Sequence, residues 1–305
     1  MSRTTVSADD GIVYEFSPDL DAAYTAASGE SLTIETVDSL GGAVQAESDV
    51  IDEVPDEVNG ATGPIAVEGA EPGDVLAVHV EDVRVNEDRG RVTTIPGFGF
   101  LREADDIEEP RSRITPVEGD GDGETIDFGG LSVDIDPVIG TIGVAPESES
   151  YTTLVPHDHG GNLDTTDVTT GSTVYFPVFQ EGAMLAMGDS KAAMADGEMC
   201  GTGAEIGTDI DVTLELLDDP AVSLDRPLVD TGSAWKTVAS AETLEDACRL
   251  AHRDLLELLG REHGFDATDA YMFASLVGGL EVSQVVDPLV TARNAIPSEY
   301  LSEPF

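Results

Sequence analysis

The feature that most constrains this chain is a succession of short β-branched and aromatic segments along its first two-thirds. Segments such as GIVYEF, SLTIETVD, STVYFPVF and DIDVTLELL alternate in part between apolar and polar residues, as half-buried strands do. Turn-forming stretches such as EPGD and DFGG separate them. Many strands at short spacing predict a mainly β fold, either a β-sandwich or a barrel-like assembly.

Helical periodicity replaces this alternation after Ser240. ETLEDACRLAHRDLLELLGREHG predicts a helix capped by Thr243 and ended by Gly260 or Gly264. Its expected buried face is formed by Leu244, Ala247, Ala251, Leu255 and Leu258. A second, shorter helix begins near Asp266 or Thr268, and strand, turn and strand follow. We therefore expect residues 1–240 to form the β core and residues 241–305 a C-terminal helical layer packed on it, not an independent domain.

The charge of the chain is extreme and is spread along its whole length. Sixty-two acidic residues face fourteen basic ones, for a formal charge of −48, and only two of the basic residues are lysines. Such a surface repels itself unless salt screens it, so we expect a halophilic protein. Nucleic acid and anionic membranes are excluded as partners, because binding phosphate needs Lys and Arg.

The other bulk features predict a cytoplasmic protein without a disulfide framework. Cys200 and Cys248 form no spacing motif. The first residues do not read as a charged-then-apolar leader, and no run approaches the roughly 18 apolar residues that span a bilayer.

Two of the five histidines lie in PHDHGGNLDTT, from Pro156 to Thr166. His157 and His159 alternate, so on an extended backbone at most one of them faces a given site. Imidazole together with one or two carboxylates is a common Zn²⁺ set, and three protein ligands leave a position for water. The alternative is a loop in which these side chains only bond turns.

Two further stretches combine acids with glycines. TGPIAVEGAEPGDVL contains Glu68 and Asp74 beside turn residues, and it also reads as a plain strand–turn–strand with solvated acids. MGDSKAAMADGEMCGTGAE places one of the two lysines among carboxylates, which raise its pKa. A carboxylate there can act as a general base, whereas a structural Lys–Asp pair is the alternative. The ionisable residues of this stretch are Asp189, Lys191, Asp196, Glu198, Cys200 and Glu205.

Together these stretches resemble the acetamidase/formamidase family over nearly the whole chain. The most specific motifs are GPIAVEGAEPGD and HGGNLD, and they are joined in the family's order by IGTIGVAPE, VYFPVFQEGAMLAMGD, DGEMCG and AYMFASLVGGLEVSQVVDP. The resemblance implies a distorted β-sandwich with added α/β elements, generally in a homo-oligomer (a dimer or higher). It also implies hydrolysis of short amides to a carboxylate and ammonia, with a divalent metal, Zn or Ca, in some relatives.

The residues and this resemblance together lead to a hypothesis with three sets of site residues. The metal ligands would come from Asp38, His159, Asp164 and Asp189. Asn162, Gly161 and Glu68 would bind the amide. Glu198, Asp196 and Lys191 would serve catalysis, with Glu198 passing the proton from a metal-activated water to the leaving amine.

One departure from the family pattern concerns the metal. Lys191 stands where the family has a histidine, and Ala195 where it has a glycine. A protonated lysine offers no lone pair. The metal would then bind with one ligand fewer, or His157 would replace the histidine, or no metal would bind.

Two other readings stay open from the sequence. Cys200 could be a nucleophile assisted by Glu198 and Lys191. The chain could also be a non-catalytic relative that binds a small amide or a divalent cation. In the enzyme readings, we expect Phe98, Phe176 and Phe179 to wall the pocket.

Overall fold

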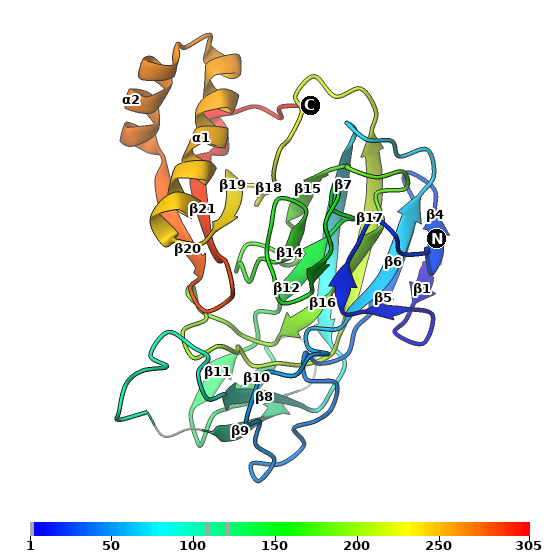
Figure 1. The fold of residues 1–305 in the computed structure, drawn as a ribbon, viewed down its shortest axis with the longest axis vertical. Helices are drawn as coiled ribbons and strands as arrows, with labels where there is room; N and C mark the ends of the chain where they lie inside the picture. Colours follow the sequence, from blue (N-terminus) through cyan, green and yellow to red (C-terminus); the bar gives the residue numbers. More distant parts are fainter. Residues whose placement is uncertain (1–2, 108–109, 120–122) are drawn as a thin grey trace.

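Two sheets contain most of the strands of the computed structural model, which describes residues 3–107, 110–119 and 123–305. The larger has nine strands within these residues (Figure 1). In spatial order they are β1 (Thr4–Val6), β5 (Ser31–Glu35), β17 (Thr208–Leu217), β7 (Val75–Val85), β15 (Thr173–Pro177), β18 (Leu228–Asp230), β19 (Ala234–Ala241), β21 (Val290–Pro297) and β20 (Gly279–Gln284).

The second sheet carries the residues that later form the candidate site. Its path through the described residues is β14 (Gly160–Asn162), β12 (Val138–Gly143), β16 (Leu185–Lys191), β6 (Ala61–Val67) and β2 (Ile12–Val13), with β4 (Tyr24–Ala26) paired to β6. β12 and β14 run antiparallel, as do β12 and β16, so the HGGN and GDSK segments flank the same central strand.

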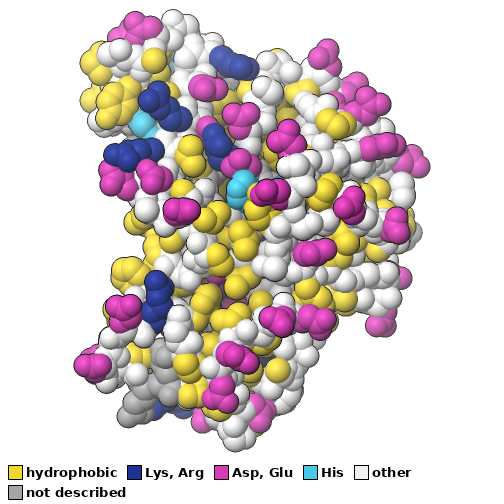
Figure 2. All heavy atoms as spheres, viewed as in Figure 1, with side chains coloured by type: hydrophobic (Ala, Val, Ile, Leu, Met, Phe, Trp, Pro, Cys, Tyr) yellow, Lys and Arg dark blue, Asp and Glu magenta, His cyan; other side chains and the backbone are white. Residues whose placement is uncertain are grey.

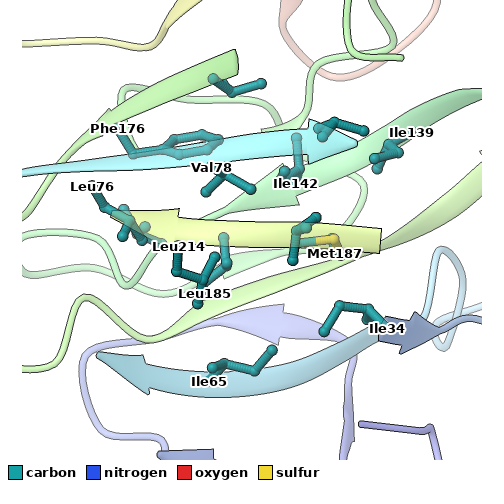
Figure 3. Packing of buried hydrophobic residues seen from close by; sticks show 14 of the residues in the cluster. Ile34, Ile65, Leu76, Val78, Ile139, Ile142, Phe176, Leu185, Met187 and Leu214 are labelled. Carbon is teal, nitrogen blue, oxygen red and sulfur yellow. The ribbon is translucent and has the colours of Figure 1, made fainter. Parts of the chain in front are cut away.

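The main hydrophobic core lies between these two sheets. Figure 3 shows side chains of β5, β7, β15 and β17 facing those of β6, β12 and β16, with Phe176, Leu214, Ile142 and Met187 among them. All four of these side chains are fully buried. Apolar burial on this scale is the main favourable contribution to folding, and it makes the pair of sheets a sandwich.

Two small sheets complete the β structure of the described chain. The four-stranded one lies at the end of the molecule opposite the helices (Figure 1) and contains β8 (Arg89–Thr94), β9 (Arg111–Glu118), β10 (Thr125–Asp127) and β11 (Ser132–Asp134). The two-stranded one pairs β3 (Glu15–Phe16) with β13 (Tyr151–Thr152).

The helices pack on the far strands of the nine-stranded sheet. α1 (Leu244–His263) contacts β19 and β21, and α2 (Ala267–Val277) packs against α1, while a short 3₁₀ helix, η1, spans Ser298–Tyr300. Thr243 caps α1 by accepting a hydrogen bond from the Asp246 amide, and Gly264 ends it in the left-handed conformation. Asp266 caps α2. Neither of these helices combines the length and the apolar character needed to cross a membrane.

The prediction of a mainly β fold with C-terminal helices is confirmed. The described sheets have open ends, so the sandwich alternative holds and the barrel does not. Leu244 is 36% exposed, so its place on the buried face of the first helix was wrong. β20 and β21 continue the same sheet as β19, so the chain after residue 241 returns to the core sheet.

Acidic side chains are scattered over the surface rather than gathered in one place, as Figure 2 shows for one face. Several of the arginines sit beside acids, for example Arg84 with Asp82 and Asp211. Exposed pairs of this kind contribute little to stability individually. The net charge therefore remains a source of self-repulsion.

Candidate functional site

The last residue of β16, Lys191, is buried among carboxylates. Its Nζ lies 2.5 Å from Oδ1 of Asp164, 2.6 Å from Oδ2 of Asp189 and 3.5 Å from Oε1 of Glu198. Glu205 forms an isolated β-bridge with Lys191, and its Oε1 accepts a hydrogen bond from the Gly203 amide. These five residues are called the lysine–carboxylate cluster below, and none of them is more than 5% exposed.

A polar chain from β12 and β14 adjoins the cluster. Asn162 accepts a hydrogen bond from Thr141 Oγ1 at 2.5 Å and donates one from Nδ2 to Asp287 at 2.8 Å. Thr141 Oγ1 also lies 3.4 Å from Oδ2 of Asp189. The Asn162 amide is thereby fixed in orientation, and it keeps one N–H and one lone pair for another partner.

Three of the cluster carboxylates sit on unusual backbone. Asp164, Asp189 and Glu198 have φ angles of 41°, 54° and 43°. Such left-handed conformations are unfavourable for residues with a Cβ, and they occur preferentially at functional sites. The surrounding fold therefore holds these three side chains in directions that a regular strand would not give them.

Burial and charge shift the pKa values of the cluster in a consistent way. Burial raises the pKa of Asp189 to about 6, against the opposing effect of the Lys191 charge. Burial, followed by the nearby Asp164 carboxylate, raises the pKa of Glu198 well above its usual range. Burial likewise raises the pKa of Glu205. Although burial alone would lower the pKa of Lys191, the carboxylates led by Asp164 and Asp189 hold it well above normal.

These shifts define which groups carry charge and which carry protons. The raised pKa of Lys191 favours its ammonium form. The glutamates around it favour the protonated form. Asp189, whose pKa is about 6, gives up its proton more readily than these glutamates do. The cluster therefore contains a carboxyl group that can accept a proton and others that can donate one, which is what general acid–base catalysis requires.

The cluster faces a small cavity of about 30 Å³. Its polar wall includes Asp189, Lys191, Glu198 and Glu205 together with Asn162 and Asp287, and its apolar wall includes Leu40, Val58, Ile95, Phe98 and Leu154. Burial raises the pKa of Asp287 as well, and the Asp164 carboxylate adds to this shift. The cavity combines apolar lining residues, which suit a short carbon chain, with several polar groups.

The structure does not bring Asp38 into this cluster. Asp38 accepts hydrogen bonds from the amides of Leu40 and Gly42 and lies 3.5 Å from Arg91, so it shapes a turn. Its neighbours Ser39 and Leu40 do line the cavity. The residue thus supports a cavity wall without presenting its carboxylate to the Lys191 carboxylates.

His159 is likewise separate from the cluster. Its ring packs against Phe16 and Tyr151, with centroid distances of 5.0 and 5.3 Å, and it lines a different hollow together with His157. Both histidines therefore face one hollow, contrary to the expectation for an extended chain, because residues 158 and 159 form a turn. Burial, with a smaller effect of His157, lowers the pKa of His159 to about 3.

Three other expected residues do not line the cavity. Asp196 accepts hydrogen bonds from Thr166 and Arg293 outside the cavity. Glu68 is exposed on the turn after β6 and is not a lining residue. Gly161 pairs with Ile142 at a φ of 86°, and a side chain there would clash with the carbonyl oxygen of Val155. Its role is thus to let β14 approach the neighbouring loop.

The phenylalanines expected to line the pocket and the thiol of Cys200 lie in different parts of the structure. Phe98 lines the cavity, whereas Phe176 belongs to the sandwich core and Phe179 lines the hollow beside His159. Cys200 lies 3.2 Å from the carbonyl oxygen of Thr202. It lines an open, mostly apolar groove that also reaches Glu198.

Thr141 and Asp287 were not predicted as site residues. Thr141 lies in IGTIGV, whose small residues allow close approach of β14 and β16, and Asp287 lies in VVDP near the C-terminus. An aspartate directly before a proline, in a segment otherwise rich in valine, was the signal available. Its partner Asn162 is 125 residues away in the chain, so no local pattern connects them.

The structure defines a mainly β sandwich with a buried lysine–carboxylate cluster, whose residues lie on β16, just after β14 and in the segment between β16 and β17. The model of the Acetamidase/Formamidase family matches residues 2–152 and 147–302. The chain belongs to this family. It is similar to the solved acetamidase of Bacillus halodurans, with 34% identity and a TM-score of 0.91 over 97% of this chain and 98% of that one.

A second solved relative gives the same result. A predicted acetamidase/formamidase of Thermoanaerobacter tengcongensis is 37% identical, with a TM-score of 0.91 over 97% of this chain and 96% of that one. The formamidase of Methylophilus methylotrophus is 27% identical over 66% of this chain and 63% of its own length. The matched region thus spans less than two thirds of that curated relative.

Proposed function

We propose that this chain hydrolyses the C–N bond of small carboxamides, giving a carboxylate and ammonia, at the lysine–carboxylate cluster. The observation that carries the proposal is the buried cavity where Asn162, Lys191 and Glu198 converge within a fold shared with acetamidases. The small volume favours substrates with a short acyl group, such as formamide or acetamide.

The donors and acceptors of the cavity suit the amide group. Asn162 retains one N–H and one lone pair, which complement the carbonyl oxygen and the NH₂ of a carboxamide. Two of the three Nζ hydrogens of Lys191 are directed at Asp164 and Asp189. The third can stabilise negative charge as it develops on the carbonyl oxygen during attack.

The proton steps follow from the protonation states. Water attacks the carbonyl carbon and gives a proton to an ionised carboxylate, for which Asp189 is the candidate. The C–N bond then breaks, and the protonated Glu198 supplies the proton that the leaving NH₂ group needs to depart as ammonia. Asp189 and Glu198 both adjoin Lys191, so the returning proton has a short path through the cluster.

The metal-activated water expected from the family has no matching ligand set among the residues that the structure describes. One oxygen each of Asp164 and Asp189 is engaged by the Lys191 ammonium, while His159 and Asp38 contact other partners. Among the described residues, no three or more His, Cys, Asp or Glu side chains are grouped so as to hold a metal ion. We therefore assign no step to zinc or calcium, and metal binding stays a prediction.

Ammonia release from formamide, acetamide and longer amides in high salt tests the proposal. We expect turnover with the short amides and a decline as the acyl chain outgrows the cavity. Cys200→Ala should retain turnover, because the thiol bonds Thr202 and lines the outer groove. Absence of ammonia release from every amide would favour the non-catalytic reading, and loss of turnover in Cys200→Ala would favour a thiol nucleophile. The homo-oligomeric state and the cytoplasmic location expected from the sequence stay predictions.

A further inference from the structure

The lysine–carboxylate cluster contains four acidic side chains and one basic side chain in a nearly solvent-free position. Ionised carboxylates are costly to bury unless a cation or a proton compensates them. A fixed cation at the point where Asp164 and Asp189 converge provides this compensation while both stay ionised. Lys191 supplies it through Nζ, at 2.5 and 2.6 Å from one oxygen of each.

The surrounding backbone leaves room specifically for this lysine. At Gly140 on β12, an added Cβ would clash with Nζ of Lys191 and Oδ1 of Asp164. At Gly203, an added Cβ would come within 2.5 Å of Cγ of Lys191. Two glycines from separate segments thus clear the head and the stem of the side chain. The site accommodates a lysine along its whole length.

An inorganic cation that bridged Oδ1 of Asp164 and Oδ2 of Asp189 would lie close to the position of Nζ. Carboxylate oxygens bind Zn²⁺ at about 2.0–2.2 Å and Ca²⁺ at about 2.3–2.6 Å. The oxygens of Asp164 and Asp189 that would supply such bonds point at Nζ, and Glu198 approaches the same atom at 3.5 Å. Ammonium and metal ion are therefore mutually exclusive at this point.

We propose that the ammonium group of Lys191 is the built-in cation of this site, holding the place among Asp164, Asp189 and Glu198 that a divalent ion would otherwise take. The inference concerns cation binding and does not depend on the proposed reaction. Its consequence is that removing the lysine head and stem converts the cluster into a carboxylate site for a divalent ion.

The experiment compares the wild-type protein with Lys191→Ala and Lys191→Met. The alanine variant opens space beside the carboxylates, whereas the methionine variant fills most of that space without a charge. Each protein is stripped with a chelator and titrated calorimetrically with Mn²⁺ and with Zn²⁺ in high salt, and Tm is measured with and without the ion. Asp164→Asn in the alanine background removes one oxygen donor and serves as the matched control.

We expect Lys191→Ala to bind one ion more per chain than the wild type does, and its Tm to rise by about 5 °C at saturating ion. Lys191→Met and the Lys191→Ala, Asp164→Asn double variant should show neither effect. Equal binding by wild type and Lys191→Ala would overturn the proposal. If the alanine variant does not fold, ion binding by the wild-type protein is the test. A tightly bound ion that is lost in Asp164→Asn would contradict the inference, and the absence of such an ion from the wild type would support it. A wild type that releases ammonia but fails this test would leave the proposed function standing.

Discussion

Replacing Glu198 by glutamine separates the chemistry of the site from its stability. Glu198 is 5% exposed, and burial together with the Asp164 carboxylate raises its pKa and favours the neutral acid. Glutamine has nearly the same shape and is also neutral, so the substitution removes the transferable proton without changing the charge of a buried group. The lysine–carboxylate cluster keeps Asp164 and Asp189 as partners of Lys191.

The expected magnitudes follow from these contacts. Loss of a general acid slows the chemical step by about 10²- to 10⁴-fold, equivalent to about 3 to 5 kcal/mol in the activation free energy. Glu198 makes a long contact, at 3.5 Å, with Lys191, and its carboxyl shares a hydrogen bond with Asp164, which the NH₂ group of a glutamine can also donate. The free energy of unfolding should therefore change by less than about 1 kcal/mol.

The assay measures kcat and KM for acetamide by ammonia release, and unfolding by denaturant, for wild type and Glu198→Gln. Glu257→Gln, on an exposed position of α1, is the matched control and should resemble the wild type in both measurements. A Glu198→Gln protein that folds normally and keeps kcat within about threefold of wild type would refute the role of Glu198 as proton donor.

Three further predictions concern the stability of the fold. Arg293 is 1% exposed and donates hydrogen bonds to Thr166, Asp167, Asp196 and the Val282 carbonyl oxygen. Arg293→Met should therefore lower the free energy of unfolding, measured with denaturant, by about 3 kcal/mol. A change below about 1 kcal/mol would contradict the account. Burial lowers the pKa of His159 to about 3, below the value of about 6.5 in the unfolded chain. Between these two pH values the unfolded chain binds one proton more than the folded protein does. The free energy of unfolding therefore decreases as pH falls through this window. Between pH 7 and about 4.5 this loss amounts to about 2 to 3 kcal/mol, and His159→Phe should lose that much less than the wild type; equal losses would show that the ring is not held neutral. Raising the concentration of a chloride salt from about 0.1 to about 1 M shortens the Debye length from about 10 to about 3 Å. Because the formal charge is −48, this screening should raise Tm. A Tm independent of salt would remove the argument for a halophilic surface.

Much of the fold followed from local patterns in the sequence. The caps Thr243 and Asp266 and the terminator Gly264 are local signals, because the bonds they form lie within one helical turn. The β-branched segments predicted strands for the same reason. Whether the strands form an open sandwich or a closed barrel could not be predicted from these local patterns. Strands such as β5 and β17 pair across more than 170 residues. Sandwich and barrel present the same local pattern.

The candidate site was likewise predictable only in part from the sequence. Asp189, Lys191 and Glu198 lie close together in the sequence, and the expectation that Lys191 meets carboxylates is confirmed. The failure of His159 and Asp38 to join them has a physical reason, because each lies in a turn whose direction depends on glycines with positive φ, at Gly160 and at Gly41 and Gly42. A few degrees of freedom at these glycines decide which wall a side chain reaches. Residue identity alone does not contain that information.

The most direct test of the central claim is a crystal structure of the wild-type protein soaked with acetamide in the presence of Zn²⁺. The account predicts the amide in the cavity between Asn162 and Glu198, with Nζ of Lys191 between Asp164 and Asp189. An anomalous zinc peak bound by Asp164 and Asp189, with the lysine displaced, would contradict it, as would an amide bound elsewhere in the molecule.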